Sequence, residues 1–228
     1  MLWPIDRARE VVAAWRDLTL DSPDELTTSL RLLAAPDDPA VPEPLRGGAF
    51  VVVDGAFSGD EAAAAAVLAP LRVLGPMVDG WQPAGPEALP FVHMGPEAPM
   101  PLQGGALMLD ALPDAALRRW LELVGPGSAS PYVSAELRHL GGELARPGAH
   151  KGARSPMRAR YLAFLAGVPA TPELAEALRA RTERVTAAMA RWTARTSYLN
   201  FAERPTDPAT LFEPEAYARL RPVKARVD

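Results

Sequence analysis

The stretch DELTTSLRLL, residues 24 to 33, alternates between polar and apolar side chains. Successive residues of a strand project to opposite faces, so this segment predicts a strand with two different faces. One face carries Thr28, Leu30 and Leu32, and the other carries Thr27, Ser29 and Arg31. A strand with one core face and one polar face is typical of an antiparallel sheet that is covered on one side only.

The stretch YVSAELRHLGG, residues 132 to 142, shows the same alternation. Its apolar face carries Val133, Ala135, Leu137 and His139, and its polar face carries Tyr132, Ser134, Glu136 and Arg138. Glu136 and Arg138 are two residues apart, so they lie on one face of the predicted strand. An ion pair on a solvated sheet is the simplest interpretation of these two residues.

Helices alternate irregularly with further strands along the rest of the chain. Residues 47 to 57 predict a buried strand, and the helix that follows begins with Ser58 and Glu61 in the spacing of a capping box. Other strands are predicted at 76–81, 105–112, 158–169 and 197–201, and other helices at 5–18, 113–125, 171–194 and 213–227. The predicted fold class is therefore α+β, an antiparallel sheet with helices packed on one face.

The composition is that of an ordinary globular protein. Of 228 residues, 48% are hydrophobic and 23% are charged, with a net charge of −4, so nothing favours nucleic acid or an anionic membrane as a partner. The sequence has no cysteine, which suits a cytoplasmic location and excludes thiolate chemistry. The first ten residues, MLWPIDRARE, do not resemble a signal peptide. We expect one domain over residues 1–228.

No standard catalytic or metal motif is present. The histidines, His93, His139 and His150, lack the paired spacing of a metal site, and no G-x-S-x-G motif occurs. The glycine pairs at 104–105 and 141–142 lack the spacing of a dinucleotide fingerprint, and such pairs are usually turns or bulges. His139 is more simply a packed strand residue.

The stretch TSYLNFAERPTD, residues 196 to 207, is short, apolar and aromatic before it breaks into charge and proline. Read as a strand, it directs Tyr198 and Asn200 to one face, and Leu199 and Phe201 to the other. A single tyrosine at a strand edge usually packs as an amphipathic side chain.

Several stretches, in order, carry a resemblance to a known family. They begin with WPIDRAREVVAAWRDLT and DELTTSLRLL, continue with FVVVDGAFSGDEAAAAAVLAPLRVLGP and SAELRHLGGELARP, and end with SYLNFAERPTD and YARLRPVKARVD. In this order and with similar gaps, the chain resembles the C-terminal half of FAD-linked oxidases of the berberine bridge enzyme type. The resemblance covers essentially the whole chain.

The resemblance implies a substrate-binding domain whose open sheet face covers the flavin of an FAD-binding domain. It implies that Tyr198 acts on a small substrate as a base or orienting hydroxyl, and that Asn200 lies close to the flavin. Glu136 and Arg138, assigned from their face and position, are expected to line the same cavity. The FAD-binding half and the C-terminal tail of such oxidases have no counterpart in the sequence, so this chain alone is not expected to retain FAD or to turn over substrate.

Three interpretations therefore stand side by side. The first is the substrate-binding portion of an FAD-dependent oxidoreductase that acts by hydride transfer to flavin. The second is a freestanding domain that binds a small molecule or a protein without oxidase activity. The third is a fragment of a longer oxidase. The uncovered sheet face is expected to pair with an FAD-binding domain or with a second copy of the chain.

Overall fold

The computed structural model describes residues 1–228 except 40, 96–98, 147–155, 204 and 228. Six strands form one sheet in the order β1-β3-β2-β5-β6-β4, and all neighbouring strands are antiparallel. The strands are β1 (Leu2–Pro4), β2 (Leu26–Ala34), β3 (Ala49–Phe57), β4 (Gln103–Leu109), β5 (Ser134–His139) and β6 (Tyr161–Gly167). The predicted α+β class with an antiparallel sheet is confirmed.

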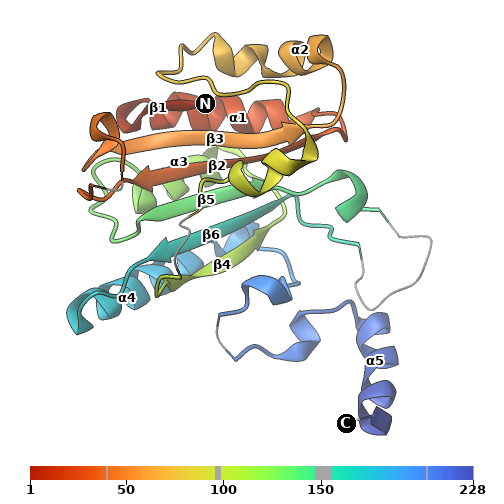
Figure 1. Cartoon of the computed structure of the whole chain (residues 1–228). Coiled ribbons are helices and arrows are strands. Elements are labelled where there is room, and N and C mark those ends of the chain that lie inside the picture. Colours follow the sequence, from red (N-terminus) through yellow and green to blue (C-terminus); the bar gives the residue numbers. More distant parts are fainter. Residues whose placement is uncertain (40, 96–98, 147–155, 204, 228) are drawn as a thin grey trace.

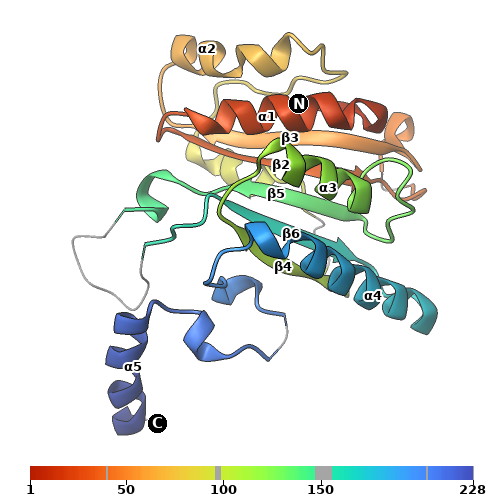
Figure 2. The same cartoon turned by 180° about the vertical axis from the view of Figure 1, so that it is seen from behind.

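All the α-helices except the last gather on one face of this sheet (Figures 1 and 2). They are α1 (Ala8–Leu20), α2 (Glu61–Arg72), α3 (Asp114–Val124), α4 (Pro172–Met189) and α5 (Pro214–Val227). Figure 2 shows α1, α3 and α4 across the sheet, with α2 beside α1, whereas α5 lies apart from the sheet. None of the helices in the described part of the chain has both the length and the apolar character needed to cross a lipid bilayer.

The apolar faces predicted for the strands meet the helices in one main core. Leu30 and Leu32 of β2 and Leu137 of β5 are all buried in it. The same core includes the fully buried side chains of Trp15 from α1 and Trp120 from α3. The apolar residues that alternate along the strands therefore pack against the apolar stripes of α1 and α3.

Trp15 connects α1 to two strands. Its Nε1 donates a hydrogen bond of 3.2 Å to Thr28 Oγ1, and Thr28 Oγ1 in turn donates to the Asp54 carbonyl at 2.9 Å. Its ring lies 5.8 Å from that of Tyr161 on β6. The hydroxyl of Tyr161 also pairs with Thr19 Oγ1 at 2.8 Å. These polar contacts within the core fix the position of α1 on the sheet.

Some local details differ from the sequence predictions. The N-cap of α2 is Asp60, whose Oδ1 accepts from Ala63 N at 2.7 Å, and the expected Ser58 box does not form. The strand expected at 76–81 is reduced to a single bridge between Val78 and Leu2, while β1 itself was not predicted.

An added Cβ on Gly105 would lie 2.9 Å from Thr182 Cγ2, so this strand glycine allows α4 to approach closely.

Replacing Trp15 by alanine is expected to lower the free energy of unfolding by about 4 kcal/mol, because it leaves a large cavity and removes the hydrogen bond that Thr28 Oγ1 accepts. The matched control is Phe91→Ala, since the Phe91 side chain is 74% exposed. This control is expected to change the free energy by less than about 0.5 kcal/mol. Urea denaturation followed by circular dichroism measures both, and similar losses in the two variants would contradict the central role of Trp15.

Candidate functional site

The face of the sheet opposite the helices carries two rows of side chains across neighbouring strands. Ser29 of β2 pairs in register with Asp54 of β3 and with Arg138 of β5. One row further along, Arg31 of β2 pairs with Glu136 of β5, and Glu136 pairs with Phe164 of β6. Because residues directly opposite in a sheet share a face, the predicted polar faces of β2 and β5 form one continuous surface.

Two ion pairs connect these rows, one between β2 and β3 and one along β5. Arg31 Nη2 lies 2.6 Å from Asp54 Oδ2, and Ser29 Oγ donates to the other oxygen of Asp54. Arg138 donates two hydrogen bonds to Glu136, from Nε to Oε1 at 2.6 Å and from Nη2 to Oε2 at 3.2 Å. The ion pair expected from the sequence is therefore present. Its carboxylate is shielded from water, since only 2% of the Glu136 side chain is exposed, whereas 36% of the Arg138 side chain is exposed.

A short segment on the open face contacts these carboxylates. We call residues 86–94 the strap: they comprise the 3-10 helix η3 (Pro86–Phe91) and the turn that follows it, and η3 lies in front of the sheet in Figure 1. His93 of the strap reaches two strands at once. Its Nδ1 lies 3.2 Å from Asp54 Oδ2, and its Nε2 lies 3.5 Å from Glu136 Oε2. Within the described part of the chain, no α-helix lies on the open face, but the strap crosses it.

Sequence reasoning did not find the role of His93, which lies in a proline-rich connection without periodicity. One signal could have pointed to it. Asp54 interrupts the apolar run of β3, and an acidic side chain in a buried strand requires a cation or several donors. The other two histidines differ in this respect: His139 packs against Tyr161 at 5.8 Å, and His150 lies outside the described residues.

The network shifts the protonation equilibria of all three central groups. Burial alone would raise the pKa of Asp54, but hydrogen bonds from His93 and Ser29 and the charge of Arg31 lower it overall. The pKa of Glu136 is also lowered, because hydrogen bonds from His93 and Arg138 outweigh its burial. Hydrogen bonds to Asp54 and Glu136 raise the pKa of His93 to about 9. At neutral pH the site therefore contains ionised carboxylates and an imidazolium.

The segment with Tyr198 and Asn200 differs from the prediction. Residues 197–201 form no strand: Leu199–Phe201 is a 3-10 turn, because Ser197 N bonds to Thr210 O and the chain finds no partner strand here. Tyr198 and Asn200 therefore do not alternate with Leu199 and Phe201 across two faces. Tyr198 is half-buried, whereas Asn200 is exposed and makes no hydrogen bond with any described residue.

Tyr198 nevertheless reaches the same face through Phe201. Their ring centroids are 5.5 Å apart, and Phe201 packs edge-on against Phe164 of β6 at 5.3 Å. The guanidinium of Arg138 lies over the Phe201 ring at 5.2 Å. The structure thus places Tyr198, Glu136 and Arg138 in one neighbourhood and adds Phe164 and Phe201, which the sequence analysis did not single out. We call this neighbourhood, together with His93, Asp54 and Arg31, the face cluster.

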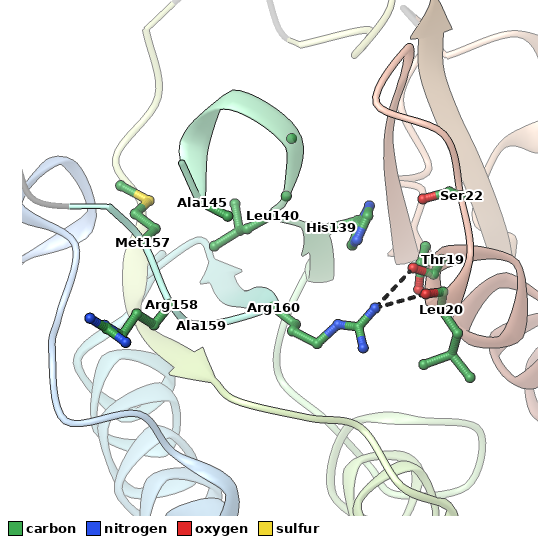
Figure 3. Close-up of a pocket in the computed structure, with 12 residues that line it drawn as sticks. Thr19, Leu20, Ser22, His139, Leu140, Ala145, Met157, Arg158, Ala159 and Arg160 are labelled. Atoms are coloured by element: carbon green, nitrogen blue, oxygen red, sulfur yellow. Dashed lines mark hydrogen bonds between the residues drawn. The ribbon is translucent and has the colours of Figure 1, made fainter. Parts of the chain in front are cut away.

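A separate cavity lies at one end of the sheet, between the end of α1 and the turn after β5 (Figure 3). Its volume is about 210 Å³, and its lining includes His139, Leu140, Met157 and Arg160. Arg160 Nη2 donates to the carbonyls of Thr19 at 3.4 Å and Leu20 at 3.0 Å, which satisfies the end of α1. None of the residues of the face cluster lines this cavity.

The described residues show no grouping of three or more histidine, aspartate or glutamate side chains that could hold a metal ion. The chemistry offered by the face cluster is instead that of fixed charges, a tyrosine hydroxyl and aromatic surface. Such groups bind and orient a ligand and stabilise charge that develops on it.

The raised pKa of His93 predicts a defined pH dependence of stability. The stabilising charge is fully present below the unfolded pKa of about 6.5 and is lost as the pH rises through about 9. Relative to a His93→Gln variant, the wild type should lose about 1 kcal/mol of unfolding free energy between about pH 6 and pH 10, a figure reduced for screening of the 40% exposed side chain.

His139→Gln provides a control of opposite sign. Burial and the charge of Arg160 lower the pKa of His139, so replacing it should favour the folded state as the pH falls below about 6.5. Urea denaturation between about pH 5 and pH 10 gives the free energy of unfolding of the wild type, His93→Gln and His139→Gln. Parallel pH profiles for the wild type and His93→Gln would show that the imidazolium does not bind the two carboxylates.

Comparisons with known proteins identify the fold. No family model matches the chain, and no curated protein matches it in sequence. Among solved structures, 6-hydroxy-D-nicotine oxidase from Arthrobacter nicotinovorans is similar with a TM-score of 0.73 and 19% identity, over 100% of this chain and 51% of that one. Wild-type BBE-like 1 from Physcomitrella patens has a TM-score of 0.72 and 11% identity, over 98% of this chain and 49% of that one.

A berberine bridge enzyme variant is also similar, with a TM-score of 0.63 and 14% identity over 88% of this chain and 42% of that chain. The chain therefore spans about half the length of the structures that it matches. At identities this low, the similarity establishes the fold alone. The chain shares the fold of half an oxidase of the berberine bridge enzyme type, as the order of its sequence stretches predicted.

Proposed function

We propose that this chain is the substrate-binding portion of an FAD-dependent oxidase that acts on a small organic substrate by hydride transfer to flavin. One observation carries the proposal: a sheet with this fold presents a charged and aromatic cluster on the face that no α-helix covers. Flavin, when bound, accepts the hydride. The residues of this chain would bind and orient the substrate.

The face suits the flat ring of a flavin held by another domain. Tyr198, Phe201 and Arg138 offer aromatic and cationic surface, and the exposed Asn200 is free to contact the ring. The described residues form no strand, glycine-rich turn and helix of the kind that cradles a pyrophosphate. We therefore assign nucleotide binding to a flavin-binding partner domain.

The geometry suggests different roles for the three proposed site residues. Glu136 is buried with a lowered pKa, so it remains ionised and holds Arg138 in place with two hydrogen bonds. Arg138 is partly exposed and would contact the substrate. Tyr198 is half-buried, with its ring beside that of Phe201, and its hydroxyl would orient the substrate or accept its proton.

A second candidate is a freestanding interaction domain without oxidase activity. The exposed apolar side chains of the strap favour it: Leu89 is 56% exposed, Phe91 74% and Met94 63%. Apolar groups that remain in water near a polar face are a common feature of protein interaction sites. The occupant would then be another protein or a second copy of this chain.

The test of the oxidase proposal begins with flavin binding. The purified chain is titrated with free FAD, and then with a separately produced flavin-binding domain that holds FAD, while the flavin spectrum is recorded. We expect a spectral change only with the flavin-binding domain, because this chain contributes the ring-facing surface alone. A chain that binds no such domain, leaves the flavin spectrum unchanged and forms a dimer in light scattering would support the interaction-domain alternative.

In the assembled complex, Tyr198→Phe is expected to slow flavin reduction by a panel of small alcohols and amines about 100-fold, the low end of the effect of a catalytic proton acceptor. Tyr217→Phe is the matched control, since Tyr217 of α5 is also half-buried but stacks on Phe212 instead of the face cluster. Rapid-mixing absorbance measures the reduction rate. Equal rates in the two variants would remove Tyr198 from the reaction.

A further inference from the structure

The charges of the face cluster are not equally accessible. The carboxylates lie beneath, with 10% of the Asp54 side chain and 2% of the Glu136 side chain exposed. Two cations lie outside them, with 40% of His93 and 36% of Arg138 exposed. A ligand that approaches this face therefore meets positive groups first.

The cluster also has more positive than negative charge. Arg31 and Arg138 balance Asp54 and Glu136, and the protonated His93 adds one further positive charge. The whole chain has a net charge of −4, so this face differs in sign from the protein as a whole. His93 and Arg138 contact the same oxygen, Glu136 Oε2, at 3.5 and 3.2 Å, so the two cations are neighbours.

Arg138 retains hydrogen-bonding capacity for a ligand. Its Nε and Nη2 are taken by Glu136, whereas its Nη1 makes no hydrogen bond with any described residue. Both ring nitrogens of His93 are directed at carboxylates, so this side chain offers charge rather than a free donor. An arginine nitrogen beside a second cation is a suitable partner for a carboxylate oxygen.

Aromatic groups lie directly beside these cations. The Arg138 guanidinium covers the Phe201 ring, which contacts Tyr198 and Phe164. A ligand with an anionic end and an apolar or aromatic body would therefore find a partner for each part within one neighbourhood. An amine would instead place its positive charge against His93 and Arg138.

We propose that the face cluster recognises a small organic anion, an apolar or aromatic carboxylate. Its carboxylate would bind Arg138 Nη1 beside His93, and its body would pack on Tyr198 and Phe201. The inference rests on the proposed substrate-binding role and names the substrate class for it. Glu136 and Asp54 are positioning residues that hold the two cations from beneath.

The test measures binding to the full chain alone, with no flavin or partner domain present. The probes are phenylacetate, phenylacetamide and phenethylamine, which share a ring and differ mainly in charge. Chemical shift changes in NMR titrations give the dissociation constants. We expect a value on the order of 1 mM for phenylacetate on this open face, and at least about 10-fold weaker binding of the other two probes.

Variants connect the selectivity to the cluster. Arg138→Gln should weaken phenylacetate binding about 10-fold, the loss of one hydrogen bond to a charged group, and His93→Gln about 3-fold with a weaker salt dependence. Arg191→Gln is the matched control: Arg191 also lies over an aromatic ring, that of Trp192 at 5.0 Å, but it is outside the cluster. The dissociation constant of Arg191→Gln for phenylacetate should equal that of the wild type.

Removing Arg138 alone leaves a buried carboxylate unpaired, so a variant with both Glu136→Gln and Arg138→Gln keeps the test valid if the single variant unfolds. Equal affinity for the three probes, preference for phenethylamine, or equal losses in Arg138→Gln and Arg191→Gln would overturn the proposal. Because no flavin takes part, anion binding can succeed where hydride transfer fails, and the reverse also holds. The two proposals are therefore tested separately.

Discussion

Asp54 and Glu136 are buried carboxylates on one face of the sheet, and much of the structure depends on neutralising them. A buried ion costs several kcal/mol unless it is paired and hydrogen-bonded. The partners come from three places in the chain: Arg31 on β2, Arg138 on β5 and His93 on the strap. Neutralising these two carboxylates therefore requires both the observed strand register and the observed position of the strap.

The same requirement reinforces the register of the sheet. A slip of one residue in β2 would turn Arg31 and Ser29 toward the core and Leu30 toward the open face. Such a slip would bury an arginine among the apolar residues around Trp15 and leave Asp54 without its partners. The helix-covered face and the charged face therefore specify the same pairing independently.

The sequence was sufficient to predict the strands that use this alternation. In β2 and β5 the apolar side chains face the helices and the polar side chains face away, so both sequences alternate with a period of two residues. This alternation predicted that Glu136 and Arg138 share a face. The role of His93 could not be predicted, because it depends on how a nonperiodic connection crosses strands distant in sequence. The Tyr198 segment was predicted as a strand because local pattern carries no information on whether a partner strand is available.

Stability alone does not account for charges at this position. Apolar side chains of similar size often replace a buried ion pair at no cost, or even with a gain. The same face already carries apolar neighbours, such as Val52 opposite Arg31 and Phe164 opposite Glu136, which would pack well against such replacements. In this network the buried Asp54 and Glu136 hold the more exposed His93 and Arg138. The positions of these charges are therefore fixed before any ligand binds. Preorganised charge of this kind favours recognition of a ligand, since little reorganisation is needed when the ligand arrives.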